Sequence, residues 1–142
     1  MMNPGRRRAR QYDLMMGALC LFREARGVPP EQMLCVWWAI LNRVNDPWNR
    51  WPKYISDVVT EPEQFSSFNP TDPNSHLFPS RRYSEDWGAF MQCLWIVAGP
   101  LGADPTHGAN FYHTIPDGEP YPIWADPAKL TLELGPFKFY RL

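Results

Sequence analysis

The stretch PPEQMLCVWWAILNRV, residues 29–44, carries the clearest helical pattern in the chain. Its two prolines suit a first helical turn, and Glu31 would meet the positive end of the helix dipole there. Apolar side chains recur every three or four residues: Met33, Val36, Trp37, Ile40, Leu41 and Val44. This spacing predicts an amphipathic helix with one buried face, ending before Pro47.

Two further helices are predicted on either side of this stretch. The first runs from about Arg10 to Arg26 and ends at Gly27. Its side chains at helical spacing are Tyr12, Met15, Met16, Leu19 and Phe22. The other begins at Ser84 as N-cap and ends at Gly99. Its expected apolar face comprises Trp87, Phe90, Met91, Leu94 and Trp95.

Between these helices, residues 45–82 are rich in Pro, Asn, Ser and Asp, which predicts a long functional loop. After Gly99 the sequence becomes typical of short β-strands and turns. Residues 109–113 are expected to form a strand, residues 116–118 a turn, and residues 130–140 one or two short strands. Helices followed by a small sheet indicate the α+β class. We expect one domain over residues 1–142, with residues 1–10 flexible.

Composition limits the classes of partner. The net charge is −1 and the isoelectric point about 6.3, so the overall charge of the protein does not favour binding to nucleic acid or to a membrane surface. No run approaches the ~18 apolar residues of a membrane span. The apolar run of residues 14–22 leads into Arg23 and Glu24 without a cleavage site, so we expect synthesis in the cytoplasm without a signal peptide. A monomer is expected.

The three cysteines, Cys20, Cys35 and Cys93, each lie in an apolar run. Their number is odd and their spacing fits no metal or redox motif. We therefore expect buried free thiols in a protein folded under reducing conditions.

Glu24 is the most informative acidic residue. It lies in the last turn of a mostly apolar helix, where the carbonyl end of the dipole disfavours a negative charge. Partial burial would act in the same direction, and both effects favour the protonated acid that a general acid needs. The alternative is an ion pair on a surface helix with Arg23, Arg26 or Arg43.

Four sequence blocks occur in order, and together they resemble the SleB/CwlJ-type cell-wall hydrolases, which include spore cortex-lytic enzymes. The blocks are Glu24-Ala25-Arg26-Gly27, residues 40–44, Gln64-Phe65-Ser66, and Asp104-Pro105-Thr106 followed by residues 108–112. The resemblance covers about residues 14–140. It implies a lysozyme-like domain with a helical core and a small β-sheet subregion.

The resemblance also implies an activity. It indicates a lytic transglycosylase that cuts peptidoglycan between N-acetylmuramic acid and N-acetylglucosamine, with Glu24 as catalytic residue and with no metal or cofactor. Such an enzyme needs one carboxylate, whereas an ordinary glycosidase needs two. Other acidic candidates lie in turn-like sequence: Asp104, Asp117, Glu119 and Asp126. The alternative to a lytic transglycosylase is a hydrolytic muramidase that uses a second carboxylate.

Polar and aromatic residues are expected to bind the glycan around Glu24. They are Gln64, Ser66, Thr106, Asn110, Tyr112, Trp48 and Trp51. Turn capping is the alternative role for Gln64 and Ser66, and an Asx turn is the alternative for residues 104–106. The chain departs from the family pattern at Val28 and Phe137, where many members carry Glu and His, which leaves the glycan preference open.

Two other functions are compatible with parts of the sequence. A zinc peptidase could use Asp104, His107 and His113, with His76 further back, but this spacing matches no strong ligand pattern. A non-catalytic wall-binding module could use the exposed aromatic residues. For the enzyme, we expect a phage or prophage lysin (an endolysin acting in phage lysis) that reaches the cell wall after release.

Overall fold

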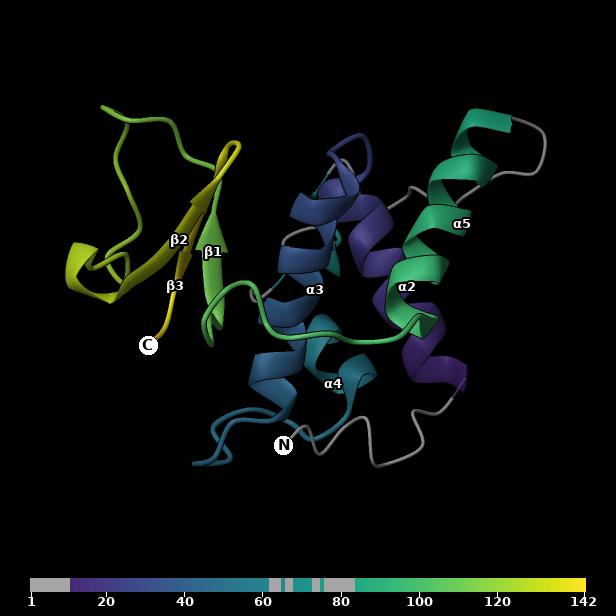
Figure 1. Ribbon diagram of the computed structural model, residues 1–142, viewed down its shortest axis with the longest axis horizontal. Coiled ribbons are helices and arrows are strands. Elements are labelled where there is room, and N and C mark those ends of the chain that lie inside the picture. Colours follow the sequence, from purple (N-terminus) through teal and green to yellow (C-terminus); the bar gives the residue numbers. More distant parts are fainter. Residues whose placement is uncertain (1–10, 62–64, 66–67, 73–74, 76–83) are drawn as a thin grey trace.

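A computed structural model describes residues 11–61, 65, 68–72, 75 and 84–142. Within these residues the elements are four α-helices and a small sheet (Figure 1). The helices are α2 (Gln11–Ala25), α3 (Pro30–Val44), α4 (Ile55–Thr60) and α5 (Ser84–Ala98). The strands are β1 (Phe111–His113), β2 (Leu130–Leu134) and β3 (Phe137–Tyr140), and the short 3₁₀ helix η3 (Pro127–Lys129) precedes β2. The α+β prediction is confirmed.

Helix α3 is the centre of the fold, as its apolar pattern predicts. Trp37 and Ile40 are fully enclosed, and Figure 1 shows α3 between the sheet and the other long helices. It packs closely against α2 because Gly17 has no side chain. A methyl group at Gly17 would lie 2.7 Å from Cζ3 of the Trp37 ring. Helix α2 ends as expected, with Gly27 in the left-handed conformation at φ 87°.

Helix α4 corrects the prediction of an unbroken loop over residues 45–82. Six residues are too short for a helical period to show in the sequence. The helix is stabilised from elsewhere: buried Asp13 of α2 accepts a hydrogen bond from the backbone N–H of Ser56, at 3.0 Å. Asp13 thus caps the N-terminus of α4 as an N-cap side chain would, although it is distant in the sequence.

The predicted apolar faces of the outer helices are only partly right. In α5, Phe90 is buried with Cys93, Ile96 and Val97, but Trp87, Met91 and Trp95 are exposed, Trp95 by 78%. Tyr12 and Met15 of α2 are exposed as well. Helix α5 is apolar nearly all round, so its periodicity could not decide which side packs against α2. The three cysteines are buried and free, as predicted.

The sheet is antiparallel with the order β1-β3-β2, so the central strand is β3. Tyr112 of β1 pairs with Phe139 of β3. Phe137 and Phe139 are buried in the common core with the helices, which joins the sheet to the helical part. None of the helices that the structure describes is long and apolar enough to cross a membrane.

Candidate active site

Glu24 and Tyr112 meet although 88 residues separate them. Glu24 is half-buried in the last turn of α2, and Tyr112 is in the middle of β1. The phenolic Oη of Tyr112 donates a hydrogen bond to Oε1 of Glu24 at 3.0 Å. One carboxylate oxygen of the expected acid is therefore fixed by a side chain from the sheet.

The phenol of Tyr112 is enclosed by aromatic rings. Its ring lies 5.8 Å from Phe137, 5.9 Å from Phe139 and 6.5 Å from Phe65, measured between centroids. Burial, together with the negative charge of Glu24, raises the pKa of Tyr112 well above its usual 10. The phenol therefore stays protonated at neutral pH and keeps its role as donor.

Arg43 of α3 brings a buried positive charge to the same region. It is 4% exposed, and its Nε donates to the backbone carbonyl of Asn110 at 2.6 Å. Its guanidinium lies over the rings of Phe111 and Phe65, at 4.5 and 5.2 Å from the centroids. Burial lowers the pKa of Arg43 to about 10, and the acidic groups of Tyr112 and Glu61 oppose that shift. Arg43 is thus still a cation at neutral pH.

The loop before β1 is fixed to the end of α3 by one carboxylate. Asp104 accepts hydrogen bonds from the backbone N–H and the hydroxyl of Thr106 with Oδ1, at 2.8 and 2.7 Å. Its Oδ2 accepts from Asn42 of α3 and from the N–H of Gly108, both at 2.9 Å. Asn42 also donates to the carbonyl of Ala109 at 2.8 Å. These bonds set the course of the chain into β1 and hence the position of Tyr112.

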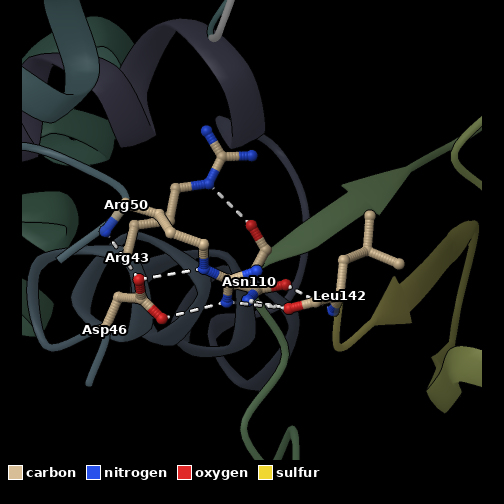
Figure 2. A network of polar contacts seen from close by, with 5 residues as sticks. All are labelled: Arg43, Asp46, Arg50, Asn110 and Leu142. Carbon is tan, nitrogen blue, oxygen red and sulfur yellow. Dashed lines mark hydrogen bonds and ion pairs between the residues drawn. The ribbon is translucent and has the colours of Figure 1, made fainter. Parts of the chain in front are cut away.

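Thr106 and Asn110, both expected to contact the sugar, are buried in this structure. Thr106 is 0% exposed, and its hydroxyl also accepts the N–H of Ala109 at 3.1 Å. The side chain of Asn110 bonds to the backbone of Leu142 in both directions, at 3.1 and 2.9 Å. Figure 2 shows Asn110 between Arg43 and Leu142. Such bonds position the loop, so a direct contact of either side chain with sugar stays a prediction.

The two tryptophans expected to bind sugar differ in their surroundings. Trp51 is half-buried, with its ring 5.8 Å from Phe111 and 5.4 Å from the guanidinium carbon of Arg43. Trp48 is 70% exposed and packs on Arg50. Trp51 is therefore one of the aromatic side chains that surround Arg43, whereas most of the Trp48 ring is exposed to solvent. Gln64 and Ser66 lie outside the described residues.

One of the histidines considered as zinc ligands, His113, has a hydrogen-bond partner within the protein. His113 is buried and bonds to the hydroxyl of Tyr140 at 2.9 Å, while His107 is exposed. In the part of the chain that the structure describes, no three His, Cys, Asp or Glu side chains gather as a metal site would require. His76 is not among those residues.

Glu61, at the end of α4, is a residue that the sequence alone did not single out. Its charge acts on Arg43, and its Oε2 is buried without a hydrogen-bond partner among the described residues. The short helix α4 brings it there, and because α4 was not predicted, no signal in the sequence pointed to Glu61. Phe65, which borders both Tyr112 and Arg43, belongs to one of the blocks that carry the family resemblance.

Comparison with solved structures gives two similar folds. The catalytic domain of the Bacillus cereus SleB protein has a TM-score of 0.61 and 27% identity, covering 94% of this chain and 92% of its own. The catalytic domain of the germination-specific lytic transglycosylase SleB from Bacillus anthracis has a TM-score of 0.65 and 27% identity, covering 95% and 98%. The lysozyme-like fold prediction is thereby confirmed. Comparison with curated protein sequences gives no match.

The family model described as Cell Wall Hydrolase matches residues 27–140. The matched segment contains α3, the loop of Asp104 and the whole sheet, and it begins just after Glu24. It spans most of the chain and agrees with the structural similarity. The chain belongs to the cell wall hydrolase family.

Proposed function

We propose that this protein cleaves the glycan strand of peptidoglycan as a lytic transglycosylase, with Glu24 as its single acid/base. Family membership supports the coarser statement that the chain is a peptidoglycan-degrading enzyme. The observation that carries the finer proposal is the bond between Tyr112 and Glu24, which unites a carboxyl group of the helical part with a phenol of the sheet. The similar SleB domain from Bacillus anthracis is itself described as a lytic transglycosylase.

In the proposed reaction Glu24 acts twice. As an acid it gives its proton to the glycosidic oxygen, and the bond from that oxygen to C1 of N-acetylmuramic acid breaks. As a carboxylate it then takes the proton of the C6 hydroxyl, whose oxygen attacks C1 and closes a 1,6-anhydro ring. The N-acetylglucosamine end leaves with the first proton as its hydroxyl, and no water is consumed.

Tyr112 and Arg43 have supporting roles in this proposal. The Tyr112 hydroxyl donates to Oε1 of Glu24 and so helps to orient the carboxyl group for the proton transfers. Arg43 places a positive charge next to Tyr112, and charges in a buried site act strongly because little water screens them. Both residues would orient and stabilise the carboxylate that forms after the first proton transfer.

Hydrolysis is the second candidate, and Glu61 is the observation that favours it. A hydrolytic glycosidase needs a second carboxylate to activate water or to attack C1. Glu61 is a carboxylate that α4 brings close enough to act on Arg43. Three of the four acidic residues considered from the sequence are engaged elsewhere. Asp104 holds its loop, Asp117 bonds to Tyr121, and Asp126 caps η3.

The test is the mass of the muropeptides released from purified peptidoglycan. Anhydromuramoyl ends from the wild type, their loss in Glu24→Gln and their retention in Glu61→Gln would support the transglycosylase. Reducing muramic ends that disappear in both variants would favour hydrolysis with two carboxylates. Equal release by wild type and Glu24→Gln would contradict both mechanisms. A protein that binds peptidoglycan without releasing any product would instead be a wall-binding module.

A further inference from the structure

A separate cavity of about 190 Å³ lies at the C-terminal end of α3. Three segments line it: the end of α3 with the following turn, the loop that leads to β1, and the two residues after β3. Neither Glu24 nor Tyr112 is among its lining residues. The cavity, called here the α3 pocket, is therefore separate from the Glu24–Tyr112 pair, although it shares Trp48 and Asn110 with the surroundings of the site described above.

Trp48 forms an exposed aromatic wall of the α3 pocket. The guanidinium of Arg50 lies over its ring at 5.3 Å and over the ring of Trp51 at 4.8 Å. Asp46 fixes that guanidinium through Nε and Nη2, at 3.0 and 2.9 Å, and Nη2 also donates to the carbonyl of Leu142 (Figure 2). One face of the indole thus rests on an ordered cation while most of the ring meets solvent. A ring held in this way loses little entropy when a ligand stacks on it.

Polar groups of two kinds line the α3 pocket beside Trp48. Arg141 lies across Gly108: a methyl group at Gly108 would be 3.3–3.4 Å from its Cδ, Nε and Cζ. Asp46 balances the charge of Arg50, but no carboxylate that the structure describes lies within 4 Å of Arg141. Oδ1 of Asn45 is buried and has no hydrogen-bond partner among the described residues. Besides the Asp46–Arg50 ion pair, the lining therefore includes one cation without an ion-pair partner and one acceptor without a donor among the described residues.

The backbone at both rims of the α3 pocket adopts an unusual conformation. Asn49 has a φ of 52° and His107 a φ of 57°. They are the non-glycine residues with positive φ in the described part of the chain. This conformation costs energy in most residues and gathers at functional sites. It shapes the turn that presents Trp48 and the loop that presents Gly108.

We propose that the α3 pocket is a second glycan subsite that binds a carboxylate-bearing N-acetyl amino sugar, the muramyl unit of peptidoglycan. The sugar ring stacks on Trp48, its carboxylate pairs with Arg141, and its acetamido N–H donates to Oδ1 of Asn45. N-acetylglucosamine has the ring and the acetamido group but lacks the acid, so the subsite distinguishes the two sugars of the strand. This inference rests on the proposed function for its choice of ligand.

The test is a titration of the full chain carrying Glu24→Gln, with N-acetylmuramic acid and N-acetylglucosamine as probes, followed by amide chemical shifts in NMR. The acidic sugar should bind at least about tenfold tighter and shift the amides of Asn45 and Gly108. Arg141→Gln should remove that preference, and Trp48→Leu should lower the affinity for both sugars about tenfold. Trp95→Leu, which changes an exposed tryptophan on α5, is the matched control and should bind both sugars unchanged.

Equal affinity for the two sugars, or equal binding by Trp48→Leu and Trp95→Leu, would overturn the inference. Amide chemical-shift changes confined to residues around Glu24 and Tyr112 would overturn the inference as well. Cleavage of peptidoglycan by the wild type is measured separately. Cleavage without binding in the α3 pocket refutes this subsite and leaves the proposed function standing, whereas binding without cleavage supports the subsite and refutes the proposed function.

Discussion

At the scale of single residues, the hydroxyl of Tyr112 is the group whose removal is most informative. Tyr112→Phe keeps the ring and its aromatic neighbours but loses the bond to Glu24. A hydrogen bond to a charged group contributes about 1.5–3 kcal/mol, so we expect peptidoglycan cleavage to slow about tenfold to a hundredfold. Product release and melting temperature measured together would check this.

The matched control is Tyr121→Phe, which removes a hydroxyl that bonds to exposed Asp117 away from Glu24. It should leave the cleavage rate unchanged. A Tyr112→Phe enzyme as fast as the wild type, with the same melting temperature, would show that the bond to Glu24 has no part in catalysis.

His113 predicts how stability depends on pH. Its Nδ1 accepts the N–H of Ile115 at 3.2 Å, so Nε2 carries the proton and donates to Tyr140. Burial, aided by the positive charge of Lys138, lowers the pKa of His113 below its usual 6.5. The unfolded chain therefore binds a proton more readily, and the free energy of unfolding should fall as the pH drops through 6.5 towards the lower folded pKa.

Urea unfolding of the wild type between pH 5 and pH 8, a range of about 3 units around the histidine pKa, would measure this fall. His113→Gln should have a flatter profile over the same range, because glutamine does not titrate. His107→Gln, at an exposed histidine, should keep the wild-type slope. Identical slopes in all three proteins would contradict the assignment to His113.

Sequence reasoning reached single residues unevenly. Glu24 was singled out by its place at the carbonyl end of a helix and by the family resemblance, Tyr112 was expected among the polar groups around it, and the structure brings the two together. Polar atoms of Thr106 and Asn110 were expected to face substrate, yet Thr106 bonds to Asp104 within its loop and Asn110 bonds to the backbone of Leu142. A residue type reveals what a side chain can bind, but not which internal partner already occupies it. The role of Glu24 in catalysis stays a prediction.

At the scale of elements, the contact between α2 and α3 depends on a missing side chain. Gly17→Ala would place a methyl group 2.7 Å from the Trp37 ring, which is buried and cannot move away freely. Overpacking of this kind costs about 1–3 kcal/mol. Alanine favours the helix by about 1 kcal/mol, which offsets part of the loss. We expect a net decrease in the free energy of unfolding, measured in urea.

Gly88→Ala is the control for helix propensity alone, because a methyl group there meets nothing within 4 Å. It should stabilise the protein by up to about 1 kcal/mol. If both alanine variants raised the stability equally, the result would contradict the claim that α2 and α3 pack closely at Gly17.

Helix α3 and the strands after Gly99 were predicted well, whereas α4 and the buried side of α5 were not. The range predicted for α3 agrees with the structure almost to the residue, since one apolar face repeats over its whole length. Helix α5 was found, but its buried side was not, because apolar residues surround it. Helix α4 was missed because Asp13, distant in sequence, provides its cap. Long-range partners of this kind leave no local signal.

At the scale of the whole molecule, Asp104 joins the helical part to the sheet. Asp104→Ala removes four hydrogen bonds, one of them to Asn42 of α3. We expect a loss of about 2–4 kcal/mol in the free energy of unfolding, since bonds to a charged group contribute about 1.5–3 kcal/mol each and part of the loop can relax. Activity should fall too, because β1 carries Tyr112.

Asp126→Ala is the control for that experiment. Asp126 is exposed and accepts one hydrogen bond, from the N–H of Ala128 in η3. Its replacement should change stability by no more than about 1 kcal/mol and leave cleavage unchanged. Equal losses in the two variants would contradict the role given to Asp104.

The fold class was predictable as a whole because helices precede strands in the sequence. The relative placement of helices and sheet was not, since it depends on bonds such as those of Asp104 and Arg43 that cross more than sixty residues. The expected phage or prophage source and the absence of a signal peptide stay predictions, because neither the family nor the fold bears on them.

The order of elements along the chain also affects how the enzyme is made. Glu24 lies in α2, but Tyr112 is held in β1 by pairing with β3, which is synthesised after both α2 and β1. Helices can form early and locally during synthesis, whereas the sheet must wait for its final strand. The carboxyl group and its phenol can therefore come together only once β3 has been synthesised, so a nascent or truncated chain that stops before β3 would carry Glu24 without the partner that positions it.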